Sequence, residues 1–211
     1  MIENIKVFVQ NSIRIESEMG VIYVDPFKME GEPKDADYIF VTHDHYDHFS
    51  PDDIKKVACE KTNLVAPAKM EKKAVNENFG VSRIMTVKPG KSYEVNGLKF
   101  ETVAMYNIMK PFHPKSSEWS GYVITANGKR VYIAGDMDLI KEAREVKCDI
   151  AMVPIGGFYT MDAQKAAELI NEIKPEVAIP VHYGSEVGRM SDGGDFARMV
   201  KEPVKVEIMI R

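Results

Sequence analysis

The chain has 211 residues, of which 45% are hydrophobic and 28% are charged, and its formal net charge is −4. This length and hydrophobic content predict one globular domain with a sizeable core, covering residues 1–211. The acidic balance argues against nucleic acid as the main partner, because nucleic-acid-binding domains usually present a basic face. Cys59 and Cys148 stand alone in the sequence, so no disulfide framework is predicted.

Two features of the sequence bear on location. The N-terminal segment is too charged, and its apolar run too short, for a signal peptide. No apolar run reaches the length needed to cross a membrane. The sequence therefore predicts a soluble, cytoplasmic protein without a membrane partner, and it carries no prediction of oligomeric state.

The first predicted elements are antiparallel strands between residues 5 and 25. Apolar residues alternate with polar ones there, and Gly20 is placed to make a turn. Asp25 follows the last of these strands and precedes Pro26. Since a residue before proline is biased away from helical angles, we expect Asp25 to be extended.

A dense cluster of polar residues follows a predicted buried strand at residues 38–41. If the chain stays extended for two more steps, His43 and His45 point the same way and can hold one metal ion. After a bend, Asp47 and His48 can reach a second ion. Imidazole and carboxylate are ligands that zinc accepts when no thiolate is offered.

Helices and strands then alternate up to residue 106. Ser50 is a fitting N-cap and Pro51 a fitting first residue for the next helix. A strand is predicted at residues 62–66 and a polar helix at 69–78. Three further strands are predicted at 84–87, 91–95 and 98–106, and Asn96-Gly97 is a strong hairpin signal between the last two.

Residues 107–119 break this pattern. The segment contains two prolines, no clear periodicity and the only tryptophan of the chain. Long irregular connections in a compact domain are usually functional or disordered, and the apolar side chains of Met109, Phe112 and Trp119 argue against disorder. We interpret the segment as a lid or pocket wall.

The last part of the chain again alternates strands and helices. Residues 121–125 and 130–134 are predicted to pair across Asn127-Gly128. Further elements are expected as a helix at 139–146, a strand at 149–154, a helix at 163–173 capped by Asp162, and strands at 177–181 and 204–210. Asp136 and His182 each come shortly after one of these strands.

The motif His43-x-His45-x-Asp47-His48 resembles the signature of the metallo-β-lactamase superfamily. The resemblance continues with Asp136, which matches the family's bridging aspartate, and His182, which matches its last histidine. It implies a four-layer αββα sandwich, an α/β fold of two mixed sheets packed face to face. It also implies two divalent ions, zinc first and manganese or iron as alternatives. An early aspartate can lie beneath the metals in this family, and Asp25 matches that place, although a structural role is an alternative for it.

The sequence departs from the family at the third histidine of the first metal. By position Asn107 occupies that place, at the end of a strand. By chemistry His113 is the better ligand, because imidazole binds zinc better than a neutral amide oxygen. Both alternatives stay open here, as does a surface position for His113 beside Pro114.

The resemblance implies hydrolysis by a hydroxide shared between two ions, with Asp47 as the group that orients water or receives its proton. Such a site favours an anionic small-molecule ester, lactone or phosphoester. The short single-domain form is most similar to the ascorbate-6-phosphate lactonase-like branch. Asn107, Tyr159 and Tyr183 are expected to contact the substrate.

Three other functions are alternatives for such a sequence. A nucleic-acid phosphodiesterase would need a clamping arm for which the chain has no room. A di-iron redox protein of this family usually carries a flavin domain and a carboxylate where this chain has His45. A non-catalytic metal-binding protein would follow if the departure at Asn107 meant a decayed site.

Overall fold

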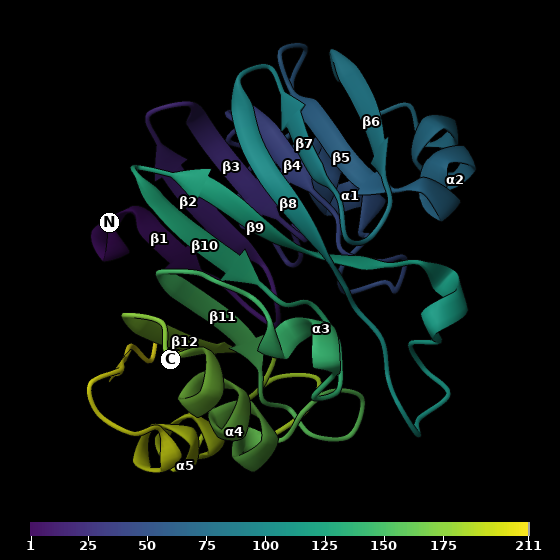
Figure 1. The fold of residues 1–211 in the computed structure, drawn as a ribbon. Helices are drawn as coiled ribbons and strands as arrows, with labels where there is room; N and C mark the ends of the chain where they lie inside the picture. The colour runs from purple at the N-terminus through teal and green to yellow at the C-terminus, as the bar shows by residue number, and fades with distance from the viewer. Residues whose placement is uncertain (211) are drawn as a thin grey trace.

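The computed structural model describes residues 1–210, which form two mixed β-sheets packed face to face with helices on the outer faces (Figure 1). The first sheet has six strands in the order β1-β2-β3-β4-β5-β6, and the second has seven in the order β13-β12-β11-β10-β9-β8-β7. The four-layer αββα arrangement expected from the sequence is confirmed.

The first sheet begins antiparallel and becomes parallel at β4. Its strands are β1 (Ile5–Val7), β2 (Ile13–Ser17), β3 (Gly20–Val24), β4 (Tyr38–Phe40), β5 (Asn63–Pro67) and β6 (Arg83–Val87). The parallel strands β4 and β5 are buried along their whole length, as expected for strands covered on both faces. The carboxyl end of β4 leads directly to the histidine cluster.

The second sheet is antiparallel at one end and parallel at the other. Its strands are β7 (Ser92–Val95), β8 (Leu98–Ala104), β9 (Ser120–Ala126), β10 (Lys129–Ile133), β11 (Ile150–Pro154), β12 (Val177–Val181) and β13 (Lys205–Val206). The two predicted hairpins are present, and Asn96 and Asn127 both have positive φ, as tight hairpin turns require. The strand predicted over 204–210 is shorter than expected, because β13 pairs with β12 only at Lys205 and Val206.

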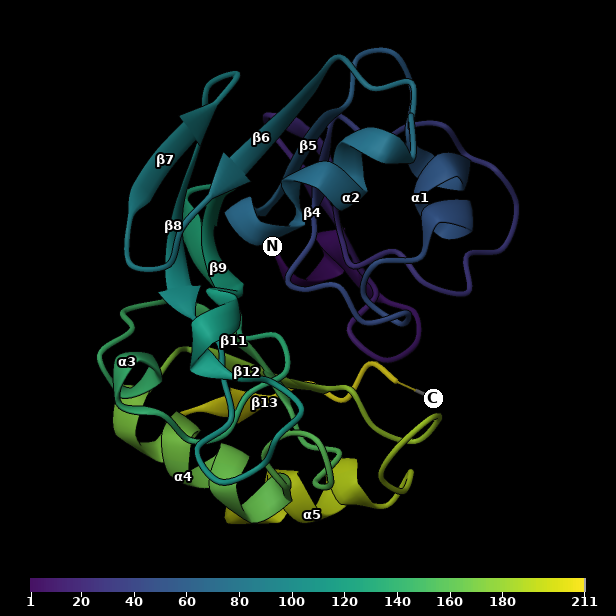
Figure 2. The same ribbon diagram turned by 90° about the vertical axis from the view of Figure 1, so that its right-hand side faces the viewer.

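The helices lie in two groups, with α1 and α2 on the side of the first sheet and α3, α4 and α5 on the side of the second (Figure 2). Their bounds are α1 (Pro51–Val57), α2 (Glu71–Asn76), α3 (Lys141–Arg144), α4 (Ala163–Ile173) and α5 (Asp192–Met199), with short 3-10 turns η1 (Ile2–Asn4), η2 (Ala68–Met70) and η3 (Lys115–Ser117). Ser50 and Asp162 cap α1 and α4 as predicted. The helix expected over 139–146 is only the single turn of α3.

Aromatic side chains connect the two sheets beneath the histidine cluster. The ring of Phe40 meets the rings of Phe100 and Tyr122 edge-on, each with a centroid separation of 5.0 Å. The hydroxyl of Tyr122 donates a hydrogen bond of 2.7 Å to the carbonyl oxygen of Val41. This contact fixes the end of β4 against the second sheet and thereby positions the residues that follow.

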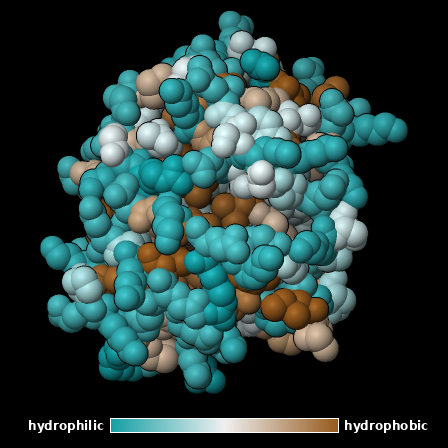
Figure 3. Space-filling view, viewed as in Figure 1, coloured by the Kyte–Doolittle hydropathy of each residue, from teal (hydrophilic) through white to brown (hydrophobic). Residues whose placement is uncertain are grey.

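Hydrophilic residues dominate the face of the molecule seen in Figure 3, and hydrophobic residues show only in small groups between them. Within residues 1–210, no helix combines the length and the apolar character needed to cross a membrane.

Candidate metal centre

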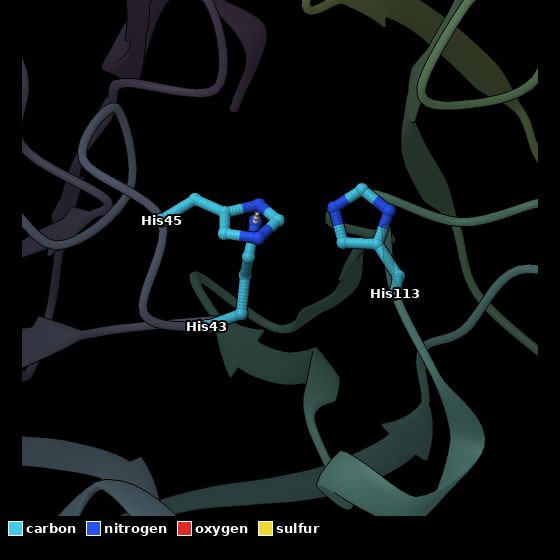
Figure 4. Close-up of side chains that lie close together, drawn as sticks. All are labelled: His43, His45 and His113. Carbon is cyan, nitrogen blue, oxygen red and sulfur yellow. Dashed lines mark hydrogen bonds between the residues drawn. The ribbon is translucent and has the colours of Figure 1, made fainter. Parts of the chain in front are cut away.

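Three histidines from two separate loops converge at one point. His43 and His45 follow β4, and their Nε2 and Nδ1 atoms are 3.0 Å apart. His113 approaches them from the loop between β8 and β9, so that all three rings face one another (Figure 4). The sequence paired His43 with His45 on the condition that the chain stays extended between them. In the structure the chain bends at Asp44, yet the two rings still meet. One ligand atom from each histidine can serve a single ion.

A second group of potential ligands lies beside the first. His182 Nε2 is 3.2 Å from Asp47 Oδ2 and 3.1 Å from Asp136 Oδ2. His48 Nε2 is 3.5 Å from Asp47 Oδ2 and 3.4 Å from Asp136 Oδ1. The other oxygen of Asp136 reaches the first group as well, since Oδ2 lies 3.6 Å from His113 Nε2. Asp136 therefore stands between the two groups.

The hydrogen bonding of these side chains fits metal binding. His48 and His113 are fully buried, and Asp136 is nearly so. Nevertheless His48 Nε2, His113 Nε2 and Asp136 Oδ1 have no hydrogen-bond partner among residues 1–210. Buried polar atoms without a partner are costly and rare. Cations bound by these atoms would satisfy them.

Asp25 lies beneath the centre and fixes the ring of His48. Its carboxylate accepts hydrogen bonds from the Thr42 backbone N–H, the Thr42 hydroxyl and Asn11 Nδ2, at 2.8, 2.6 and 2.7 Å. It also contacts His48 Nδ1 at 2.7 Å, which turns Nε2 toward Asp47 and Asp136. Asp25 is not extended as predicted: its φ is 44°. The left-handed conformation turns the carboxylate inward, and these contacts compensate its cost.

Asn107 and His113 interact with each other, and the structure separates their positions. His113 lies with His43 and His45, whereas Asn107 lies behind it. Asn107 Oδ1 is 2.8 Å from His113 Nδ1, and Asn107 Nδ2 donates to the carbonyl oxygen of Tyr159 at 3.0 Å. Since both ends of its amide are engaged, Asn107 does not present the substrate contact that the sequence had predicted.

Burial keeps the first group of histidines neutral. It lowers the pKa of His43 well below its usual value and also lowers the pKa of His45. The same cause lowers the pKa of His113 to about 4. Neutral imidazoles are the form that binds metals.

The second group is an array of opposite charges. Burial opposes the protonated form of His48 and His182, but the charge of Asp136 together with hydrogen bonds to the neighbouring carboxylates outweighs it and raises both pKa values, that of His182 to about 9. Burial would raise the pKa of Asp47 and Asp136, yet their contacts with His182 and His48 lower both. Without a bound metal, the protons on the two histidines therefore balance the negative charges of the two carboxylates.

A cavity of about 530 Å³ opens above the centre. One side is aromatic: the rings of Phe112 and Tyr159 are 4.7 Å apart, so the loop 107–119 forms a wall as predicted. The lining residues are Gln10, His45, Tyr46, Asp47, Phe112, His113, Asp136, Tyr159, His182, Glu186 and Val187.

Tyr183 is not part of this lining. Its side chain is fully buried, and it packs so closely on α5 that a Cβ atom at Gly193 would lie 2.6 Å from its hydroxyl oxygen. The structure thus places the Tyr183 side chain against α5 and outside the cavity lining, although the sequence predicted a substrate contact for it.

Five further residues shape the site, and the sequence assigned none of them a role at the metal centre. Gln10 reaches Asp47 and His182 from the loop between β1 and β2. Tyr46 and Lys28 both contact Glu186 at the cavity mouth. Trp119, singled out only as part of the loop, lies with its ring centroid 5.0 Å from that of His43 and 5.2 Å from that of His45. These residues are far from one another in the sequence, and the fold brings them together at the site.

The family model described as Beta-lactamase superfamily domain matches residues 4–182. A UPF0173 metal-dependent hydrolase from Methanopyrus kandleri is 31% identical over 218 aligned positions, covering 94% of this chain and 92% of the relative. A second from Saccharolobus solfataricus is 33% identical, covering 84% of this chain and 79% of the relative.

Solved structures give the same picture. A crystal structure named as that of a metal-dependent hydrolase from Parabacteroides distasonis superposes with a TM-score of 0.82 at 28% identity, covering 98% of this chain and 93% of that one. A metallo hydrolase from Ignicoccus hospitalis, 21% identical, has the same fold with a TM-score of 0.76 and coverage of 98% and 94%.

Proposed function

This chain belongs to the metallo-β-lactamase superfamily and is a metal-dependent hydrolase, and on that premise we propose a two-metal mechanism acting on an anionic small-molecule ester, lactone or phosphoester. The observation that carries the proposal is the pair of adjacent ligand groups that share Asp136 at the base of one cavity. Zinc is the first choice of metal, with manganese or iron as alternatives.

The two ions divide the side chains between them. We assign His43, His45 and His113 to the first ion, and Asp47, His48 and His182 to the second. Asp136 contributes an oxygen to both groups, being 3.4 Å from His48 Nε2 and 3.6 Å from His113 Nε2. Two bound divalent ions would supply electrophilic polarisation of the scissile group and would lower the pKa of water to roughly 7.

The protein's own part in the reaction is to position groups and to move a proton. Asp47 and Asp136 both line the cavity, but Asp47 is the more exposed of the two, at 8% against 2%. Asp47 is therefore the carboxylate placed to orient an attacking water and accept its proton. Phe112 and Tyr159 shield one side of the cavity from solvent.

Charge and size define the substrate class. The four positive charges of two divalent ions exceed the two negative charges of Asp47 and Asp136, so the loaded site attracts an anion. Glu186 at the mouth pairs with Lys28 and adds little net charge. A cavity of about 530 Å³ lies in the range of small-molecule sites.

Two measurements on purified protein test the proposal. Elemental analysis after loading with excess zinc or manganese should approach two ions per chain, and a screen of lactones, carboxylic esters and phosphoesters should reveal turnover that a chelator abolishes. Uptake that stops at one ion would reject the two-metal mechanism. Turnover restricted to nucleic acid would reject the small-molecule assignment.

We also propose that residues 1–211 act as one catalytic domain located in the cytoplasm. The single domain is supported by the ligand positions, which extend from the loop after β4 to the residue after β12. Cell fractionation followed by immunodetection would test the location.

A further inference from the structure

Gln10 occupies a backbone position that favours glycine. Its φ is 53°, in the left-handed region that residues with a Cβ adopt only with backbone strain. The backbone is fixed there by His182, whose N–H donates a hydrogen bond of 2.9 Å to the Gln10 carbonyl oxygen. A glycine would form the same turn without strain, so the side chain itself requires an explanation.

The side chain of Gln10 is fully buried and ends among the second group of candidate ligands. Its Nε2 atom is 3.3 Å from Asp47 Oδ2 and 3.2 Å from His182 Nε2. Asp47 Oδ2 and His182 Nε2 are themselves 3.2 Å apart. Donor atoms about 2.0–2.1 Å from one ion lie roughly 3.0–3.4 Å from each other, the shorter value holding for six ligands and the longer for four. The end of the Gln10 amide therefore stands where a further donor atom would stand.

The Oε1 atom at the other end of the amide indicates which atom of Gln10 would bind the ion. Gln10 Oε1 has no hydrogen-bond partner within the described part of the chain, residues 1–210, although the side chain is fully buried. A half-turn of the amide exchanges Oε1 and Nε2 with almost no change in shape. A cation held by Asp47 and His182 would repel the amide hydrogens and attract the oxygen.

We propose that Gln10 is a ligand of the second ion through its amide oxygen, an inference that rests on the two-metal function proposed above. Gln10 then adds a neutral oxygen to Asp47, His48, His182 and Asp136. Because oxygen donors suit manganese better than softer ions, this ligand shifts the preference of the second site toward manganese relative to zinc.

The test measures the affinity for each manganese ion by chelator competition, independently of turnover. Gln10→Gly should weaken the second ion about tenfold to a hundredfold and leave the first unchanged. Circular dichroism of the metal-free variant checks that it is folded, since glycine relieves the left-handed strain but removes a buried side chain. Gln10→Glu, which keeps an oxygen at the same distance along the chain, should retain or tighten the second ion.

Lys174→Gly is the matched control, because Lys174 is an exposed residue with φ of 49° at the end of α4. It should relieve similar strain without changing either affinity. A Gln10→Gly variant that binds the second ion as tightly as the natural chain overturns the ligand role, even if turnover falls. A natural chain that binds only one ion overturns both this role and the two-metal function, so the two failures are distinguishable.

Discussion

The Oδ1 atom of Asn107 lies 2.8 Å from Nδ1 of His113, and this contact determines which nitrogen of the imidazole faces the centre. The carbonyl oxygen of Tyr159 can only accept a hydrogen bond, so it fixes Nδ2 of Asn107 on its own side. Oδ1 must then face His113, whose Nδ1 carries the proton. The lone pair of Nε2 is left for a cation, as in other sites where a hydrogen bond orients a ligating histidine.

Replacement of Asn107 by alanine should weaken the first ion about tenfold to a hundredfold, because His113 loses the partner that sets its tautomer. His113→Ala should weaken the same ion further, since it removes the donor atom. Competition titrations with a chromogenic chelator would measure both. Loss of affinity in Asn107→Ala with none in His113→Ala would contradict this arrangement and make Asn107 the ligand.

Asp25→Ala should destabilise the metal-free protein by about 3–5 kcal/mol, the usual effect of breaking a buried polar network. The substitution strands donors on Asn11 and Thr42 and frees the ring of His48. Urea unfolding at neutral pH would measure the difference. Asp25→Asn is the control: asparagine tolerates the left-handed backbone and keeps one acceptor, so its effect should be smaller. A loss below about 1 kcal/mol for alanine would show that the network contributes little.

Asp47→Ala should abolish turnover on any substrate that the screen identifies, since it removes both a ligand and the accessible carboxylate. Cys148→Ser serves as the comparison, because this thiol lies outside the cavity lining. Initial rates with both variants at saturating metal decide the matter. Near-normal rates for Asp47→Ala would refute the proton role.

Metal uptake should depend on pH differently at the two groups. The raised pKa of His182, about 9, means that its imidazole is protonated at pH 7 in the metal-free protein. A metal ion binds the neutral ring. Binding of the second ion should therefore release protons from the protein, and its affinity should increase as the pH rises toward 9. The pKa of His113, lowered to about 4, leaves that ring neutral at pH 7, so binding of the first ion should release few protons. Calorimetry in buffers of different ionisation enthalpy would count the protons; equal release for both ions would contradict the prediction.

The sequence predicted those parts of the site that one short segment or one strand end carries. His43, His45, Asp47 and His48 lie within six consecutive positions, so local pattern indicated them, whereas Asp136 and His182, each after a buried strand, were expected from the resemblance to the family. The layered fold could be predicted for the same reason, because strand and helix periodicities are local.

Contacts between segments that are distant in the sequence could not be predicted from local patterns. Asp25 was expected to be extended because Pro26 follows it, yet hydrogen bonds from residues 11, 42 and 48 hold it left-handed. Gln10 meets His182 across 172 positions of sequence, and no spacing rule links them. Tyr183 follows His182 in the sequence, yet its side chain lies outside the cavity lining, because adjacent residues of a chain direct their side chains to different sides.

The packing of Trp119 against His43 and His45 gives the protein a built-in optical reporter. It is the only tryptophan in the chain and is 8% exposed, so its emission comes from one largely desolvated indole beside the first group of histidines. An ion bound by that group changes the charge on the three histidine rings that pack against the indole, His43, His45 and His113. A fluorescence titration therefore follows the filling of this first position without any label being attached.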